Sequence, residues 1–151
     1  MSELMEGINN SERFVSDIKQ ILQHYCKDKN YLFCGMSVPF YGNTRMSFSA
    51  LKAVRQLFPN TPIISGGTAT TDMFKNRLSD DTLKPLADVC DYLLPGEADN
   101  TIVELAGWLE NRNHLIPNGL YELKTGKVLS EEYIIKPEPL SQANTRLMPD
   151  Y

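Results

Sequence analysis

Apolar residues recur in the first half of the chain at the spacings of two helices. Six of them share one stripe in the first segment: Phe14, Val15, Ile18, Ile21, Leu22 and Tyr25. Six more mark the second segment: Met46, Ala50, Leu51, Val54, Leu57 and Phe58. Spacings of three, four and seven residues place side chains on one face of an α-helix. The pattern therefore predicts an amphipathic helix in each segment.

Three short apolar runs predict strands. They cover residues 31–37, 62–65 and 91–94. The first run is apolar at both odd and even positions, which is typical of a strand covered on both faces of a sheet. The second run is equally compact and is also interpreted as a buried strand.

The remaining segments continue a strand, loop and helix order. A polar loop with a weak helical pattern follows Gly67, and four apolar positions mark a last helix: Ile102, Leu105, Ala106 and Leu109. Such alternation predicts parallel strands, because a tight turn cannot join parallel neighbours. Residues 119–124 and 127–135 flank Thr125-Gly126, which suits a β-hairpin. We therefore expect an α/β chain with a parallel sheet and an appended hairpin.

The length and charge of the chain narrow its class. At 151 residues it has the length of one domain, which we place at residues 1–136, with an extended tail or linker at 137–151. Its 15 Lys and Arg are outnumbered by 19 Asp and Glu, which argues against a nucleic-acid partner. No apolar stretch approaches the roughly 20 residues that cross a bilayer, and the first residues do not resemble a signal peptide. We expect no membrane partner and a cytoplasmic location.

The cysteines and histidines predict no metal site. Cys26, Cys34 and Cys90 match no zinc, haem or iron-sulfur spacing, and any disulfide scheme leaves one unpaired. Cys34 lies in an apolar run, where a free thiol behaves as a small buried hydrophobe. Neither His24 nor His114 has a neighbouring Cys or His. We expect neither metal ligands nor catalytic residues in this chain.

Three loops that follow the predicted strands carry glycine together with hydroxyl or amide groups. They cover residues 37–44, 65–71 and 95–101. In an open parallel sheet, ligands bind beyond the carboxyl ends of the strands. Glycine lets a ligand approach the backbone, and hydroxyls supply neutral hydrogen bonds. With the Phe40-Tyr41 pair, which we expect to be exposed, the loops indicate a ligand with a flat apolar part and a polar periphery.

Each loop also has a simpler interpretation. Gly, Ser, Thr and Asn are the residues that turn a chain and cap a helix. Glu97 stands near a helix start, where the helix dipole favours a carboxylate. A phosphate cradle is disfavoured, because no loop contains Gly-x-Gly-x-x-Gly or Gly-Lys-Ser/Thr.

The order of these motifs resembles the cobalamin (B12)-binding domain of cobalamin-dependent radical-SAM proteins. The motifs are residues 34–38, 62–70, 91–94 and 96–101. The likeness continues from 118 to 151, a stretch that in the family precedes the radical-SAM barrel. It implies a Rossmann-like, flavodoxin-like, doubly wound sheet, truncated at its N-terminus, where the family has two further strands.

The resemblance also implies a cofactor site. Nine residues are its candidates: Ser37, Val38, Tyr41, Ser65, Gly66, Gly67, Thr68, Gly96 and Glu97. The two serines would donate hydrogen bonds, the paired glycines would give room to the nucleotide tail of cobalamin, and Gly96-Glu97 would border the pocket. The parent would be an Fe-S oxidoreductase or a methyltransferase. Its 4Fe-4S cluster and S-adenosylmethionine would belong to a radical-SAM domain further along the same parent chain, because this sequence has no Cys-x-x-x-Cys-x-x-Cys.

Two departures from the family leave alternatives open. The Asp-x-His-x-x-Gly motif, with which classic B12 domains ligate cobalt, is absent, and residues 1–30 supply only a helix. The chain could thus be a degenerate interaction domain that has lost cobalamin, which Phe40 and Tyr41 folded inward would indicate. A flavodoxin-like signalling domain is disfavoured, because Asp72 lies too far beyond its strand to be a phosphorylation site. Missing strands would open a sheet edge, where we expect a homodimer or another intermolecular contact.

Overall fold

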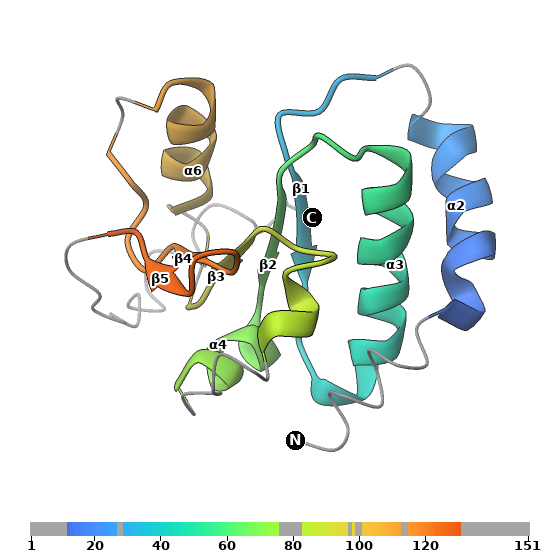
Figure 1. Ribbon diagram of the computed structural model, residues 1–151, viewed down its shortest axis with the longest axis horizontal. Coiled ribbons are helices and arrows are strands. Elements are labelled where there is room, and N and C mark those ends of the chain that lie inside the picture. Colours follow the sequence, from blue (N-terminus) through green and yellow to red (C-terminus); the bar gives the residue numbers. More distant parts are fainter. Residues whose placement is uncertain are drawn as a thin grey trace, which may run out of the picture.

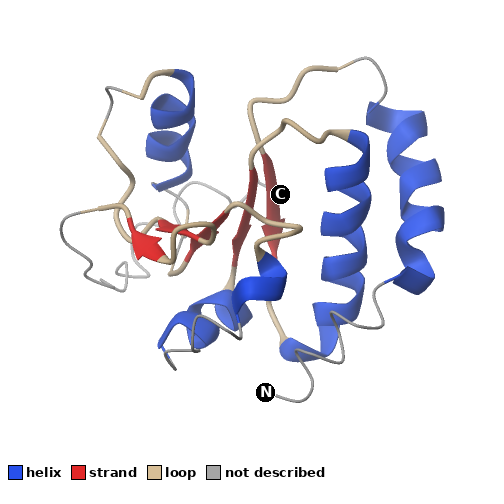
Figure 2. Ribbon diagram, in the orientation of Figure 1, coloured by secondary structure: helices blue, strands red, loops and turns tan. Residues whose placement is uncertain are grey.

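A computed structural model describes residues 12–26, 29–75, 83–96, 98, 101–112 and 115–130. These residues form an α/β structure around a mixed five-stranded sheet (Figures 1 and 2). The strands lie in chain order across the sheet: β1 (Cys34–Ser37), β2 (Ile63–Gly66), β3 (Tyr92–Leu94), β4 (Tyr121–Glu122) and β5 (Lys127–Val128). β1, β2 and β3 are parallel, and the β4–β5 hairpin is antiparallel beside β3. The prediction of an α/β chain with an appended hairpin is confirmed.

Helices cover both faces of this sheet. Within the described ranges the α-helices are α2 (Glu12–Cys26), α3 (Thr44–Leu57), α4 (Thr68–Lys75) and α6 (Thr101–Glu110), and two 3₁₀ turns are η1 (Tyr41–Asn43) and η2 (Lys84–Leu86). α2 lies beside α3, α6 lies on the opposite side of the sheet, and α4 lies at its lower end (Figure 1). The predicted amphipathic helices correspond to α2, α3 and α6.

Some predictions fall outside the described residues. This is true of the tail at 137–151 and of the hairpin beyond residue 130. In the part of the chain that is described, none of the helices combines the length and the apolar character needed to cross a membrane.

The core is divided between the two faces. On one face, Ile63 and Leu93 pack with apolar residues of α3 and with the segment around η2. On the other face, their chain neighbours Ile64 and Leu94 pack with Leu105 and Trp108 of α6. This division follows from strand geometry, because successive side chains point to opposite faces. Two adjacent apolar residues in a strand therefore serve two separate cores.

β1 departs from the sequence prediction. We expected burial on both faces, and this is wrong: Cys34 and Met36 are half-buried, whereas Gly35 and Ser37 are exposed. β1 is the outermost strand, and the core beneath α6 is built on Ile64 and Leu94 of the next two strands. An apolar run does not reveal whether a strand is central or at an edge.

α4 begins where the sequence predicted a polar loop. The hydroxyls of Thr70 and Thr71 donate to the carbonyl oxygens of Gly66 and Gly67, each over 3.0 Å. Threonine has a modest helix propensity, and such bonds back to residue i−4 often bend helices. Ala69 and Thr70 are buried, so packing stabilises α4 although its threonines have a modest helix propensity.

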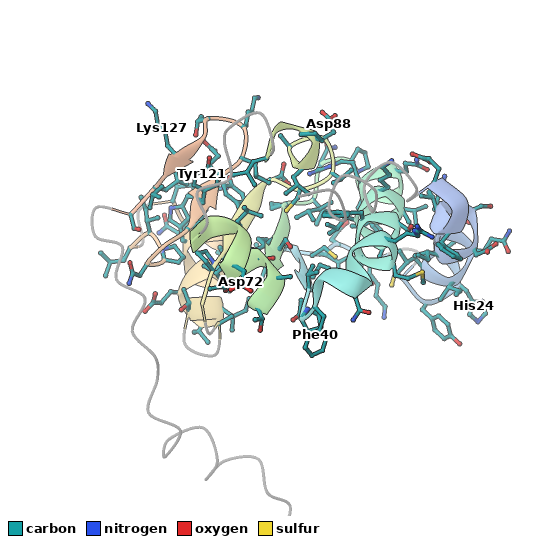
Figure 3. All side chains as sticks on the ribbon, turned by 90° about the horizontal axis from the view of Figure 1, so that it is seen from below. His24, Phe40, Asp72, Asp88, Tyr121 and Lys127 are labelled. Carbon is teal, nitrogen blue, oxygen red and sulfur yellow. The ribbon has the colours of Figure 1, made fainter. Side chains whose placement is uncertain are left out.

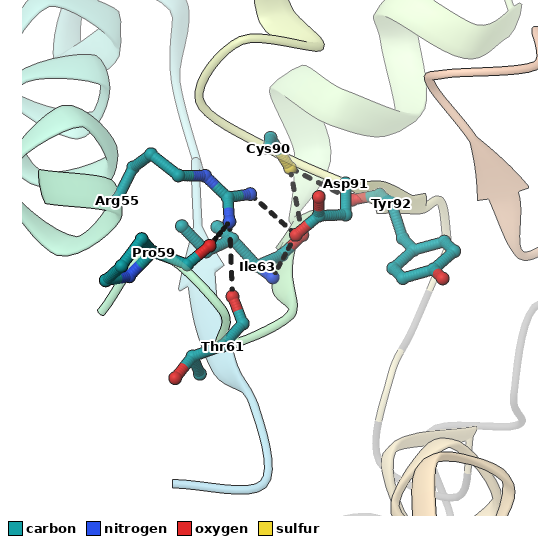
Figure 4. Close-up of polar contacts among 7 residues, drawn as sticks. All are labelled: Arg55, Pro59, Thr61, Ile63, Cys90, Asp91 and Tyr92. Atoms are coloured by element: carbon teal, nitrogen blue, oxygen red, sulfur yellow. Dashed lines mark hydrogen bonds and ion pairs between the residues drawn. The ribbon is translucent and has the colours of Figure 1, made fainter.

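A carboxylate connects four segments at the amino ends of the strands (Figure 4). Asp91 Oδ2 accepts hydrogen bonds from Arg55 Nη2 at 2.6 Å and from the amide of Ile63 at 2.8 Å. Arg55 Nη1 also donates to the carbonyl oxygens of Pro59 and Thr61. The cluster therefore fixes the end of α3, the loop after it, and the first residues of β2 and β3 relative to one another.

Replacing the Asp91 carboxylate should destabilise the fold. Asp91→Ala leaves the Arg55 guanidinium and the Ile63 amide without this acceptor, so we expect a loss of about 1–3 kcal/mol in the free energy of unfolding, measured in urea. Asp91→Asn keeps an acceptor oxygen and should cost less. Asp88→Ala, at an exposed position in the preceding turn, is the control. Equal effects of the substitutions at positions 88 and 91 would contradict this role of Asp91.

Candidate functional site

The carboxyl ends of the three parallel strands meet at one edge of the sheet. In register, Ser37 lies beside Gly66, and Gly66 lies beside Leu94. We call this edge the carboxyl rim and define it as residues 37–40, 66–71 and 94–96. Figure 3 views the molecule from this end, with Phe40 and Asp72 labelled. The structure thus brings together the described parts of the three loops that the sequence singled out.

The first two loops are in direct contact at Gly67. The amide of Val38 donates to the carbonyl of Gly66 at 2.8 Å, and the Val38 carbonyl accepts from Ala69 at 3.0 Å. Gly67 has φ +94°, and a Cβ there would lie 2.9 Å from the backbone N and O of Val38 and 3.0 Å from Ser37 Oγ. Both the conformation and the space require glycine. Val38 itself is fully buried.

Thr71 links the second loop to the third. Its hydroxyl accepts from the amide of Gly96 at 2.8 Å and donates to the carbonyl of Gly67 at 3.0 Å. Gly96 also has a positive φ, +92°, but a Cβ there would meet nothing within 4 Å. The three loops are therefore held as one unit, mainly through backbone groups.

The predicted hydroxyl ligands separate into two groups. Ser65 is only 4% exposed, and its Oγ lies 3.1 Å from Thr70 Oγ1 in a buried hydrogen bond. Ser37 and Thr68, in contrast, are exposed. Among the candidates that are described, these two place a hydroxyl side chain at the surface of the rim.

Small residues gather on one face of the sheet beside the rim. Gly35 and Ser37 of β1 and Gly66 of β2 lie on the same face of the sheet as α6, since they alternate with the residues that pack under α3. A Cβ on Gly35 would meet only the ring of Phe33, at 3.7 Å, whereas one on Gly66 would lie 3.2 Å from the Leu94 carbonyl oxygen. We call these three residues the small-residue floor. Sequence reasoning missed Gly35, although its position two residues before Ser37 was the available signal.

Two further features follow β1 along the chain. Phe40 is 71% exposed and projects outward (Figure 3), so the expected exposure of this residue is confirmed. Asn43 occupies the N-cap of α3 without a side-chain capping hydrogen bond, and the first turn of α3 holds no acidic residue. The positive end of the helix dipole therefore has no acidic counterpart in that turn. The side chain of Tyr41, and Glu97 as a whole, lie outside what the structure describes.

The described residues offer little reactive chemistry. Among them, no three His, Cys, Asp or Glu side chains gather as a metal site. Cys34 is half-buried and packs against the core under α3, and desolvation raises the pKa of its thiol. Burial raises the pKa of Cys90 from 9.0 to about 12. Neither thiol is therefore disposed to act as a thiolate nucleophile.

Alanine substitutions at three glycines should separate strain from crowding. Gly67→Ala combines a positive φ with a backbone clash and should cost more than about 2 kcal/mol of unfolding free energy. Gly96→Ala should cost about 1 kcal/mol of unfolding free energy, because alanine is strained at a positive φ but meets no neighbouring atom there. Gly42→Ala, where a Cβ meets nothing within 4 Å, should change stability by less than about 0.5 kcal/mol. Thermal or urea unfolding would measure the series, and a Gly67→Ala protein as stable as Gly42→Ala would refute the close contact.

Burial of the Cys90 thiol should make stability depend on alkaline pH. The raised pKa means that the folded chain keeps a proton that the unfolded chain loses, so stability should fall between about pH 9 and 12, by at most about 1.4 kcal/mol per pH unit. Below the unfolded pKa this contribution is fully present. Cys90→Val should remove this part of the pH dependence, measured by urea unfolding at several pH values. The same alkaline slope in both proteins would contradict the assignment.

Comparisons with known proteins give no identification. No family model matches the sequence, and no curated protein or solved structure matches it either.

Proposed function

We propose that the chain is a cobalamin-binding module of a radical-SAM Fe-S oxidoreductase or methyltransferase, and that it does not catalyse the reaction by itself. The observation that carries the proposal is the small-residue floor, Gly35, Ser37 and Gly66, next to the tight Val38–Gly67 contact. This combination leaves sheet backbone open to a flat group at the carboxyl rim, where α/β sheets bind their ligands. The motif order described above supplies the chemical identity of that group.

The strand order is compatible with a flavodoxin-like sheet. Such sheets have the order 2-1-3-4-5, and their ligand binds where the order reverses, between strands 1 and 3. β1, β2 and β3 are parallel and consecutive, as strands 3, 4 and 5 of that order would be. If β1 corresponds to strand 3, the strand order reverses at the outer side of β1, beside Gly35 and Ser37. The floor would then lie where this fold class holds its cofactors.

The residues of the rim fit part of the cofactor. A flat ring system could lie against Gly35 and Gly66, and the exposed hydroxyls of Ser37 and Thr68 could bond its amide periphery. The uncapped start of α3 suits the phosphate of a nucleotide tail. Bound cobalamin would supply its cobalt-carbon chemistry for methyl transfer or radical rearrangement. We propose no histidine ligand to cobalt from this chain, since His24 lies on α2 and His114 is outside the described residues.

A second candidate is an interaction domain that has kept the fold and lost the cofactor. The buried hydrogen bond between Ser65 and Thr70 favours it, because the Ser65 hydroxyl is already paired within the protein. The exposure of Phe40 weighs against it, because we expected that ring to fold inward in a site that had closed. The two candidates differ in whether the floor binds a ligand.

Binding of hydroxocobalamin to the full chain tests the proposal. We expect co-elution in gel filtration with a shifted visible spectrum. Gly35→Leu, where the protein has space for the side chain, should obstruct the floor and weaken binding by about tenfold or more. Val103→Leu, at a 71% exposed position on α6, is the matched control and should bind as the unaltered chain does.

The outcome separates the two candidates. An unaltered chain that fails to bind cobalamin while remaining folded would contradict the cofactor role and favour the interaction domain. Equal binding by the Gly35→Leu and Val103→Leu proteins would show that the ligand lies away from the floor. Circular dichroism of each variant would establish that the fold is retained.

A further inference from the structure

The outer side of β1 presents unpaired backbone groups. The amides of Cys34 and Val38 donate to Pro62 and Gly66, so the even-numbered residues of this strand direct their backbone groups toward β2. Gly35 and Ser37 therefore direct their N–H and C=O groups to the opposite side. Within the described ranges, no strand pairs with that side.

Among the residues that the structure describes, this edge lacks the usual protection against pairing. Natural edge strands are blunted by lysine, proline, bulges or covering segments. Residues 31–38 contain no charged residue and no proline. Tyr31 and Leu32, just before the strand, are exposed apolar residues. Residues 31–38 can therefore pair with another strand without an electrostatic penalty.

A second apolar surface lies next to the same edge. Val15 and Leu22 of α2 point to the core side, whereas Ile21 and Tyr25, a quarter turn away, are 57% and 70% exposed. α2 packs along α3 and lies on the side of α3 away from β2 in both views (Figures 1 and 3). His24, whose ring contacts Tyr25 edge-on, lies on the same lower side of Figure 3 as Phe40, which follows β1. Leu22 of α2 and Met36 of β1 pack against the same core cluster, so the exposed Ile21 and Tyr25 belong to a helix on the β1 side of that core.

We propose that an uncharged, extended segment of a partner protein adds to β1 as a further strand, with its apolar side chains against Ile21 and Tyr25 of α2. The free groups of Gly35 and Ser37 would supply the main-chain hydrogen bonds, as in recognition by β-strand addition. The absence of charge in residues 31–38 and the exposed Ile21 and Tyr25 define the chemistry of the segment: neutral, and apolar at alternate positions. The inference does not rest on cobalamin binding.

The position of α2 argues for a bare strand over a second copy of this chain. Suppose that a second copy paired with the first through β1 about a two-fold axis. The α3 of the second copy covers the β1 of that copy, so it would lie on the same face of the joined sheet as the first α3. That place, beyond β1 and alongside α3, is the one that α2 occupies (Figure 1). An isolated strand carries no helix and meets no such obstacle. The homodimer that the open edge suggested would therefore require α2 to move.

A designed peptide provides the probe. We would use fluorescein-labelled Thr-Val-Ile-Val-Thr-Val followed by two lysines for solubility, and the same peptide N-methylated at alternate residues, which cannot pair as a strand. We expect saturable anisotropy binding of the first peptide and none of the second. Addition of the first peptide should also slow amide exchange of Gly35 and Ser37, which in the free chain should exchange faster than Met36.

Charge placed on α2 provides matched variants. Ile21→Lys with Tyr25→Lys should weaken peptide binding by about tenfold or more, because the ammonium groups would be desolvated against an apolar strand. Gln20→Lys with Gln23→Lys adds the same charge at exposed positions on another face of α2 and should change binding less than about twofold. Absence of saturable binding, equal binding of the N-methylated peptide, or a stable dimer that protects Gly35 would each overturn the proposal.

Discussion

The close contact between Val38 and Gly67 is the constraint on which the candidate site depends. Without a side chain at Gly67, the backbone of the second loop reaches that of the first, and the amide and carbonyl of Val38 bond to Gly66 and Ala69. α4 therefore starts immediately at the end of β2. Its threonines in turn bond back to the glycine carbonyls and, through Thr71, to Gly96. One missing Cβ thus determines how three loops converge.

The sequence was a good guide to elements whose signal is local. The periodic stripes of α2, α3 and α6 predicted the helices, and the structure buries Val15, Leu51 and Leu105. The stripes were too wide, since Ile21, Tyr25 and Met46 are exposed. The compact run around Ile63-Ile64 correctly indicated a buried strand, and the run around Leu93-Leu94 correctly indicated a further strand. The hairpin followed from Thr125-Gly126, where Gly126 adopts φ +67°.

Features that depend on tertiary neighbours were not predictable in the same way. β1 has an apolar sequence, but its burial is decided by its place at the edge, which no residue in the strand specifies. The sequence predicts only a polar loop with a weak helical pattern where α4 lies, because the helix is stabilised by packing of Ala69 and by hydroxyl bonds to preceding carbonyls. The gathering of the three loops at one rim could be anticipated from parallel topology alone. The buried pairing of Ser65 with Thr70 could not, because it depends on where α4 begins.

The two ends of the parallel strands are stabilised by different means, and this difference leaves several side chains of the rim without a structural role. At the amino ends, the side chains of Arg55 and Asp91 make the connections, so their substitution would loosen the fold. At the carboxyl ends, backbone groups and the buried Thr71 make them, so the exposed side chains of Ser37, Thr68 and Phe40 are not committed to holding the loops together. Gly35 and Ser37 belong to both the floor and the open edge. Their exposed faces form part of the floor, and their outward backbone groups form the edge. A strand added at the edge and a ligand on the floor would be neighbours, and by linkage each would alter the affinity for the other by the same factor.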